Sequence, residues 1–174
     1  MIGGVSDARQ RQEKKLSVWL ATLAAAGLAA GLTLAAQAGT AKQDPAIRGA
    51  GTSMLRGGTG APKFTPVITK FAFSYRGGEG GFECLALVPS APAGKSGSGN
   101  FLTNVMYVTG TITSVRIAGD TAVMKGSASV TGLGAGANKP FTATATRGGP
   151  GATLVLTVSG LTFNEIVLKG QIVF

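Results

Sequence analysis

The chain has 174 residues, and its 16 lysines and arginines against 7 aspartates and glutamates give a formal net charge of +9 at pH 7. It contains no histidine and one cysteine. The missing histidine excludes the commonest general base, histidine-dependent triads and imidazole metal sites, and a lone cysteine excludes an intramolecular disulfide. We therefore predict a non-catalytic protein with no catalytic, cofactor-binding or metal-binding residues.

The N-terminus has the pattern of an export signal. Arg9, Arg11, Lys14 and Lys15 precede a stretch rich in alanine and glycine that carries no charge until Lys42. The small-x-small pattern at 36–38 suits signal peptidase, so we predict a signal peptide over residues 1–38, forming a helix and cleaved after residue 38. An uncleaved membrane anchor is the alternative, because the apolar stretch is long enough to span a bilayer.

Residues 39–63 contain mainly glycine, alanine and threonine with few large apolar side chains. This composition predicts a flexible lead-in. From residue 64 onward, short β-branched and aromatic runs are separated by glycine, proline, asparagine or aspartate, which is typical of strands and turns. We therefore predict one antiparallel β domain over residues 64–174.

Eight runs qualify as strands, and no segment after residue 39 shows a helical period. Many of them alternate apolar and polar residues, as half-buried antiparallel strands do. Gly119 and Asp120 have the length and chemistry of a tight hairpin turn. The predicted fold is all-β, with about eight short strands forming a small barrel or a two-sheet sandwich. The runs are 65–75, 82–88, 101–109, 111–118, 121–131, 140–147, 152–159 and 166–174.

The acidic residues offer little for catalysis. Glu83 and Glu165 could in principle form a glycosidase-like carboxylate pair across strands. Single solvated or turn-capping acids are the simpler interpretation, with Glu165 following Asn164 in a predicted turn. Cys84 alternates with Phe82 and is expected to be a small buried residue rather than a reactive thiol.

Two alternatives concern ligands and membranes. In the first, the domain is a small barrel that carries an apolar ligand, with aromatic side chains facing it: Phe71, Phe73, Tyr75, Tyr107 and Phe141. In the second, it is an eight-stranded outer-membrane barrel, because residues 166–174 alternate toward a terminal phenylalanine. Two observations disfavour the second alternative. The chain has few aromatic residues to form girdles at the membrane interfaces, and lysines interrupt the predicted strands.

The basic charge is dispersed along the chain. Without residues 1–38, 12 basic residues stand against 5 acidic ones. Such a surface favours anionic partners, so cell-envelope or other anionic surface components are the candidates. Nucleic acid is not expected, because the Arg-Gly-Gly segments at 56, 76 and 147 are isolated and suit turns. Contact with a membrane is expected only through the signal sequence over residues 1–38 or as an outer-membrane barrel.

The order of motifs resembles a known module. A Phe-x-Phe strand at 71–73, a long glycine hairpin over 108–134 and a second glycine hairpin after residue 140 are similar to a glycine-rich all-β accessory module of secreted bacterial proteins. The resemblance implies an exported β domain and transfers no functional residues. We predict a secreted or periplasmic β domain with a binding or extracellular structural role.

Overall fold

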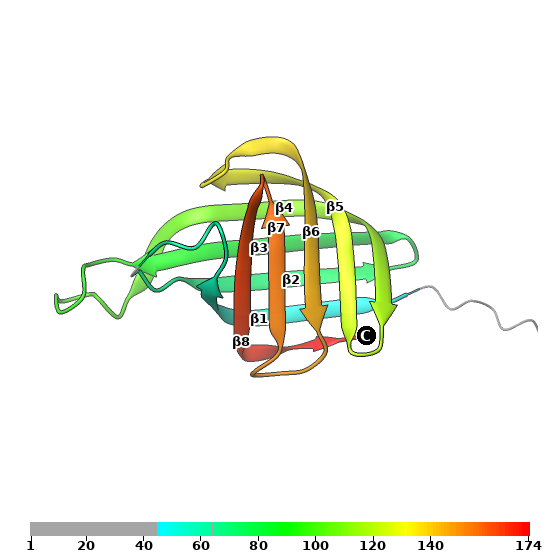
Figure 1. Cartoon of the computed structure of the whole chain (residues 1–174), viewed down its shortest axis with the longest axis horizontal. Helices are drawn as coiled ribbons and strands as arrows, with labels where there is room; N and C mark the ends of the chain where they lie inside the picture. Colours follow the sequence, from blue (N-terminus) through cyan, green and yellow to red (C-terminus); the bar gives the residue numbers. More distant parts are fainter. Residues whose placement is uncertain (1–44, 64) are drawn as a thin grey trace, which may run out of the picture. The chain divides into compact units, whose positions relative to one another are not determined.

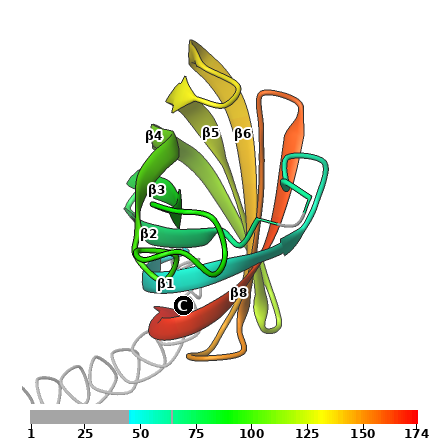
Figure 2. The same ribbon diagram turned by 90° about the vertical axis from the view of Figure 1, so that its left-hand side faces the viewer.

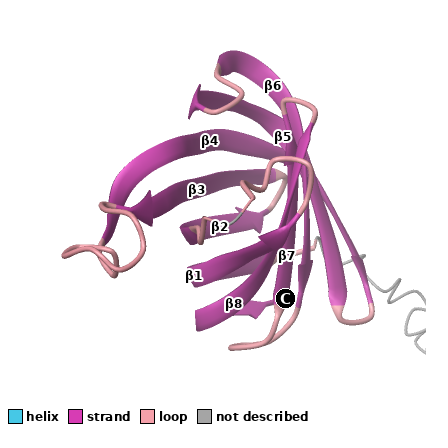
Figure 3. Ribbon diagram, turned by 60° about the vertical axis from the view of Figure 1, so that its left-hand side comes forward, coloured by secondary structure: helices cyan, strands magenta, loops and turns pink. Residues whose placement is uncertain are grey.

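A computed structural model describes residues 45–63 and 65–174. Every regular element in this part of the chain is a strand (Figure 3). The predicted signal sequence over 1–38 lies outside the described residues. The strands are β1 (Ile47–Gly57), β2 (Ile68–Arg76), β3 (Glu79–Pro89), β4 (Phe101–Ala118), β5 (Thr121–Gly132), β6 (Gly136–Thr146), β7 (Thr153–Val158) and β8 (Leu161–Val173).

The strands form one closed antiparallel barrel. Each strand pairs with its neighbours in sequence, and β1 also pairs with β8, so the sheet has no free edge (Figures 1 and 2). Closure satisfies the backbone groups that an edge strand would leave unpaired. The predicted all-β antiparallel fold of about eight strands is confirmed. The prediction left a barrel and a two-sheet sandwich open, and the structure is a barrel.

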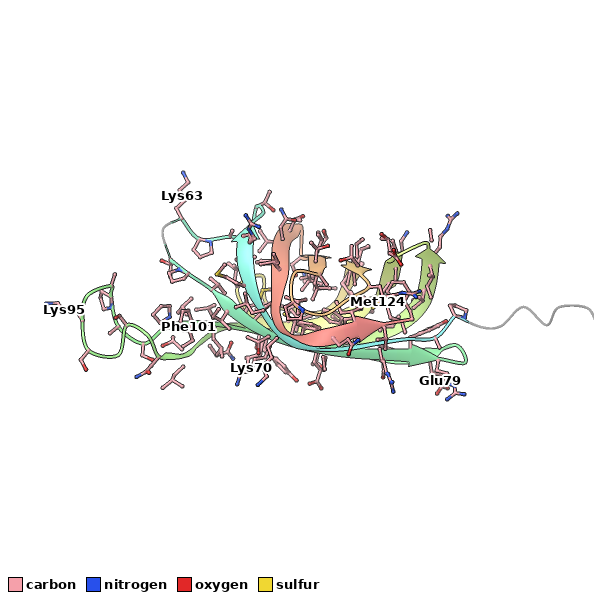
Figure 4. The ribbon with its side chains drawn as sticks, turned by 90° about the horizontal axis from the view of Figure 1, so that it is seen from below. Lys63, Lys70, Glu79, Lys95, Phe101 and Met124 are labelled. Carbon is pink, nitrogen blue, oxygen red and sulfur yellow. The ribbon has the colours of Figure 1, made fainter. Side chains whose placement is uncertain are left out.

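Alternation places apolar side chains inside the barrel and polar ones outside. On β2, Phe71, Phe73 and Tyr75 are buried, whereas Lys70 and Arg76 are exposed. Figure 4 shows the same division, with Lys70 and Glu79 pointing away from the barrel. Most of the buried residues are thus apolar, and their burial stabilises the fold.

The predicted boundaries need two corrections. Strand β1 lies within the segment 39–63 that we expected to be a flexible lead-in, so the domain begins before residue 64. The predicted runs 101–109 and 111–118 form the single strand β4, which crosses Gly110 without interruption. The predicted number of eight strands agrees with the structure because two errors cancel: β1 was not predicted, and β4 was predicted as two strands.

A β-bulge interrupts the pairing of β8 with β1. Thr52 pairs with Lys169, but the next residue, Ser53, pairs with Val167, so Leu168 is the additional residue on β8. Such a bulge reverses which side chains face inward along the rest of the strand. Glu165 and Val167 point into the barrel before the bulge, and Ile172 does so after it.

Candidate functional site

One end of the barrel interior is filled by aromatic rings. Phe71 and Phe73 stack with their centroids 6.0 Å apart, Phe73 and Phe82 with 6.3 Å, and Phe82 meets Phe141 at 5.1 Å. Glycines on neighbouring strands make room for these rings: a Cβ on Gly49 would collide with the ring of Phe73. At this end the rings therefore pack against one another and against the glycine backbone.

The other end holds an apolar pocket of about 460 Å³. It lies where β1, β3 and β7 end and β2, β4 and β8 begin. Its volume is within the range of small-molecule sites, and eight-stranded barrels are wide enough to hold one small ligand. The apolar walls include Leu55, Val67, Val88, Val105, Met106 and Leu156.

A buried polar cluster lies at this pocket. Ser53 on β1 and Thr69 on β2 are direct cross-strand partners, and Glu165 on β8 reaches them from the other side of β1. Both hydroxyl groups are hydrogen-bonded to Glu165 Oε2 at 2.5 Å, and the two hydroxyl oxygens are hydrogen-bonded to each other at 2.5 Å. The side chains are 0%, 3% and 3% exposed. Among the described residues that line the pocket, Glu165 alone carries a carboxyl group.

The electrostatics of the pocket favour neutral side chains. Burial raises the pKa of Glu165 above its ordinary value, and the hydrogen bonds with Ser53 and Thr69 offset only part of this effect. Cys84 also lines the pocket. The pKa of its thiol is raised well above the usual range, mainly by burial and to a smaller extent by the nearby Glu165. Cys84 is therefore a buried free thiol, as its alternation with Phe82 predicted.

Hydrogen bonds hold the rim of the pocket in place. The β1–β2 loop is tied to β8, because Gly60 N donates to Thr162 O and Thr162 N donates to Thr59 Oγ1. In the β5–β6 turn, Leu133 N donates to Val105 O. Thr59, Gly60 and Leu133 all line the pocket, so its entrance is a preformed part of the barrel.

The aromatic residues that we expected to face a ligand lie elsewhere. Phe71, Phe73, Tyr75 and Phe141 belong to the buried core, and Tyr107 is half-buried on β4. None of the five lines the pocket beside Glu165. The structure places four of them together, in the core cluster.

The sequence pattern led us to place Glu165, the acidic residue that lines the pocket, in a turn. Glu165 lies within β8 and faces the interior, so its assignment to a turn is wrong. Glu83 is exposed on the outer face of β3, so the two carboxyl groups lie on opposite faces of the barrel wall and form no pair. The one usable signal was the alternation Phe163-x-Glu165-x-Val167, which puts a carboxyl group between two apolar side chains on one face.

Two kinds of feature are absent from the described residues. Residues 45–63 and 65–174 contain no group of three or more histidine, cysteine or acidic side chains placed to hold a metal ion. In the same part of the chain, no helix has the length and hydropathy needed to cross a membrane.

Comparisons with known proteins give no match: no family model fits the chain, and no curated protein or solved structure is significantly similar to it. The site must therefore be interpreted from its own geometry and chemistry.

Proposed function

We propose that this protein is an exported binding protein that holds one small apolar molecule inside its barrel. The observation that carries the proposal is the preformed apolar pocket of about 460 Å³ with a buried carboxyl cluster. A pocket with apolar walls and a few convergent polar groups is the usual form of a small-molecule site. A purely structural barrel gains nothing from leaving one end unfilled, since an unfilled core costs stability.

Export is the part of the proposal that rests on sequence alone. The basic segment and the apolar stretch before residue 38 support it. Fractionation of the producing cells, with sequencing of the mature N-terminus, tests this part. Recovery of the intact chain from the cytosol would contradict export and leave the binding proposal to its own experiment.

An outer-membrane barrel is the competing proposal for the same strands. Membrane barrels present an apolar band to lipid and alternate it with an interior that is commonly polar. Here Lys70, Ser74 and Arg76 face outward from β2, and most of the buried residues are apolar. This distribution favours the binding protein. Fractionation with the outer membrane, together with heat-dependent migration in a gel, would instead support the membrane barrel.

Displacement of a fluorescent apolar dye tests the binding proposal directly. We expect the purified protein to bind Nile red and lipids or other small apolar molecules to displace it. Ala86→Phe fills the pocket and should weaken dye binding at least tenfold, because Ala86 is part of its lining. Ala72→Phe is the matched control, because it adds the same ring to an exposed position on β2. The proposal fails if the wild type does not bind the dye or if the two variants bind it equally well.

A further inference from the structure

The polar cluster has a proton arrangement that identifies what it can offer a ligand. The oxygens of Ser53, Thr69 and Glu165 Oε2 contact one another pairwise, which makes three contacts. Each contact needs one proton between its two oxygens, and the two hydroxyl groups supply only two. The third proton must belong to the carboxyl group. In this arrangement Glu165 is a neutral carboxylic acid, with its proton, like those of the two hydroxyl groups, inside the cluster.

The other carboxyl oxygen remains for a ligand. Among residues 45–63 and 65–174, no group is hydrogen-bonded to Glu165 Oε1. Every fully buried side-chain oxygen in the same residues has a hydrogen-bond partner. Because Oε1 has none, it is not fully buried, and it is open to the pocket that Glu165 lines. In the neutral acid this atom is a carbonyl oxygen, which accepts a hydrogen bond. The burial that raises the pKa of Glu165 agrees with this protonation state.

We propose that the pocket selects an apolar molecule ending in one hydrogen-bond donor, such as an aliphatic alcohol, whose donor group binds Glu165 Oε1. This inference rests on the proposed function and adds the chemical class of the ligand. The apolar walls bind the chain by burial, and the single acceptor fixes the orientation of the end group. A molecule of the same size without a donor buries the same surface and leaves the acceptor unpaired, which costs affinity.

A pair of isomers tests the inference on the wild-type protein. 1-Octanol and heptyl methyl ether have the same atoms, but only the alcohol has a donor. We expect 1-octanol to displace Nile red at about one tenth of the concentration that the ether requires, which is the effect of one buried hydrogen bond. Equal displacement by the two isomers would overturn the inference and leave the binding function intact. If the wild type does not bind Nile red, the proposed function itself fails.

Substitution of Glu165 tests the role of the neutral acid. Glu165→Gln keeps a carbonyl oxygen and a group that donates to the hydroxyls, so the preference for the alcohol should stay within threefold of the wild type. Glu165→Met removes the acceptor at similar length and should abolish the preference. Loss of the preference in Glu165→Gln would show that the carboxylate charge is needed, which contradicts the neutral acid. The glutamine variant and the isomer pair remain decisive if the methionine variant does not fold.

Discussion

The protonation of Glu165 predicts a specific pH dependence of stability. The side chain is 3% exposed, and burial raises its pKa above the ordinary value of 4.5, which the unfolded chain retains. Between these two pKa values the folded protein binds more protons than the unfolded chain. The contribution of Glu165 to the free energy of unfolding therefore falls as pH rises through this window, and it is constant above the folded pKa.

The size of the effect follows from linkage. One proton of difference changes the free energy of unfolding by about 1.4 kcal/mol per pH unit. A window of one pH unit thus removes about 1.4 kcal/mol, and a wider window removes proportionally more. Glu165→Gln cannot ionise, so its stability should lack this decline. The difference in stability between wild type and variant isolates the effect, since both chains keep every other titrating group.

Urea denaturation followed by circular dichroism, in steps from pH 4 to pH 8, measures the two stability curves. We expect the wild type to lose stability relative to Glu165→Gln as pH rises above 4.5. Glu83→Gln is the matched control, because it removes a carboxyl group from the exposed face of β3, and its curve should parallel the wild type. Parallel curves for wild type and Glu165→Gln would refute the argument that burial keeps this acid protonated.

Three further predictions concern other parts of the barrel. Cys84 is buried and its thiol pKa is raised, so iodoacetamide at pH 8 should modify the folded protein at least tenfold more slowly than the urea-unfolded chain, as measured by mass spectrometry; equal rates would mean that the thiol is accessible. Gly126→Ala should destabilise the protein by about 1–3 kcal/mol in urea, because the new Cβ would overlap the Thr111 carbonyl oxygen and the Phe141 ring. In the control Gly81→Ala the new Cβ would make only an ordinary van der Waals contact, at 3.9 Å from the Gly110 carbonyl oxygen, so this variant should differ from wild type by less than about 0.5 kcal/mol. Similar losses for both variants would contradict the steric explanation. Asp120→Asn should change stability by less than about 0.5 kcal/mol in the same assay, because the Arg147 ion pair of 3.8 Å is exposed to solvent, and a loss above about 1 kcal/mol would contradict this view.

The fold class was predictable because period-two alternation and turn chemistry are local. Phe71 and Phe73 alternate with small or polar residues, and Gly119-Asp120 forms the expected turn between β4 and β5. The first strand could not be recognised in this way. Its inward positions include Gly49 and Ser53, which have no apolar pattern of their own. They suit a strand because the large ring of Phe73 lies against Gly49 and Glu165 bonds Ser53, and both partners are distant in sequence.

The candidate site depended on a feature that composition does not reveal. Apolar alternation at 166–174 suggested one continuous face through Ile166, Leu168 and Ile172. The bulge at Leu168 instead turns Glu165 and Val167 inward and leaves Leu168 45% exposed. Gly170, with a φ of +116°, lies just beyond the bulge, where a Cβ would collide with the Ala50 backbone. A one-residue change of register thus converted an expected surface acid into the polar group of the pocket.

The pairing of β1 with β8 also sets an order of events in the life of the chain. Ser53 is made early and Glu165 late, so the polar cluster cannot assemble until the last strand has been synthesised. Contacts between such distant segments form slowly, and the unclosed sheet exposes edges in the meantime. The pocket therefore does not exist during synthesis, and under the proposed binding function a ligand binds only after the barrel has closed. For a chain that is exported before its barrel closes, the pocket would form at the destination, and under the proposed function it would bind molecules present there.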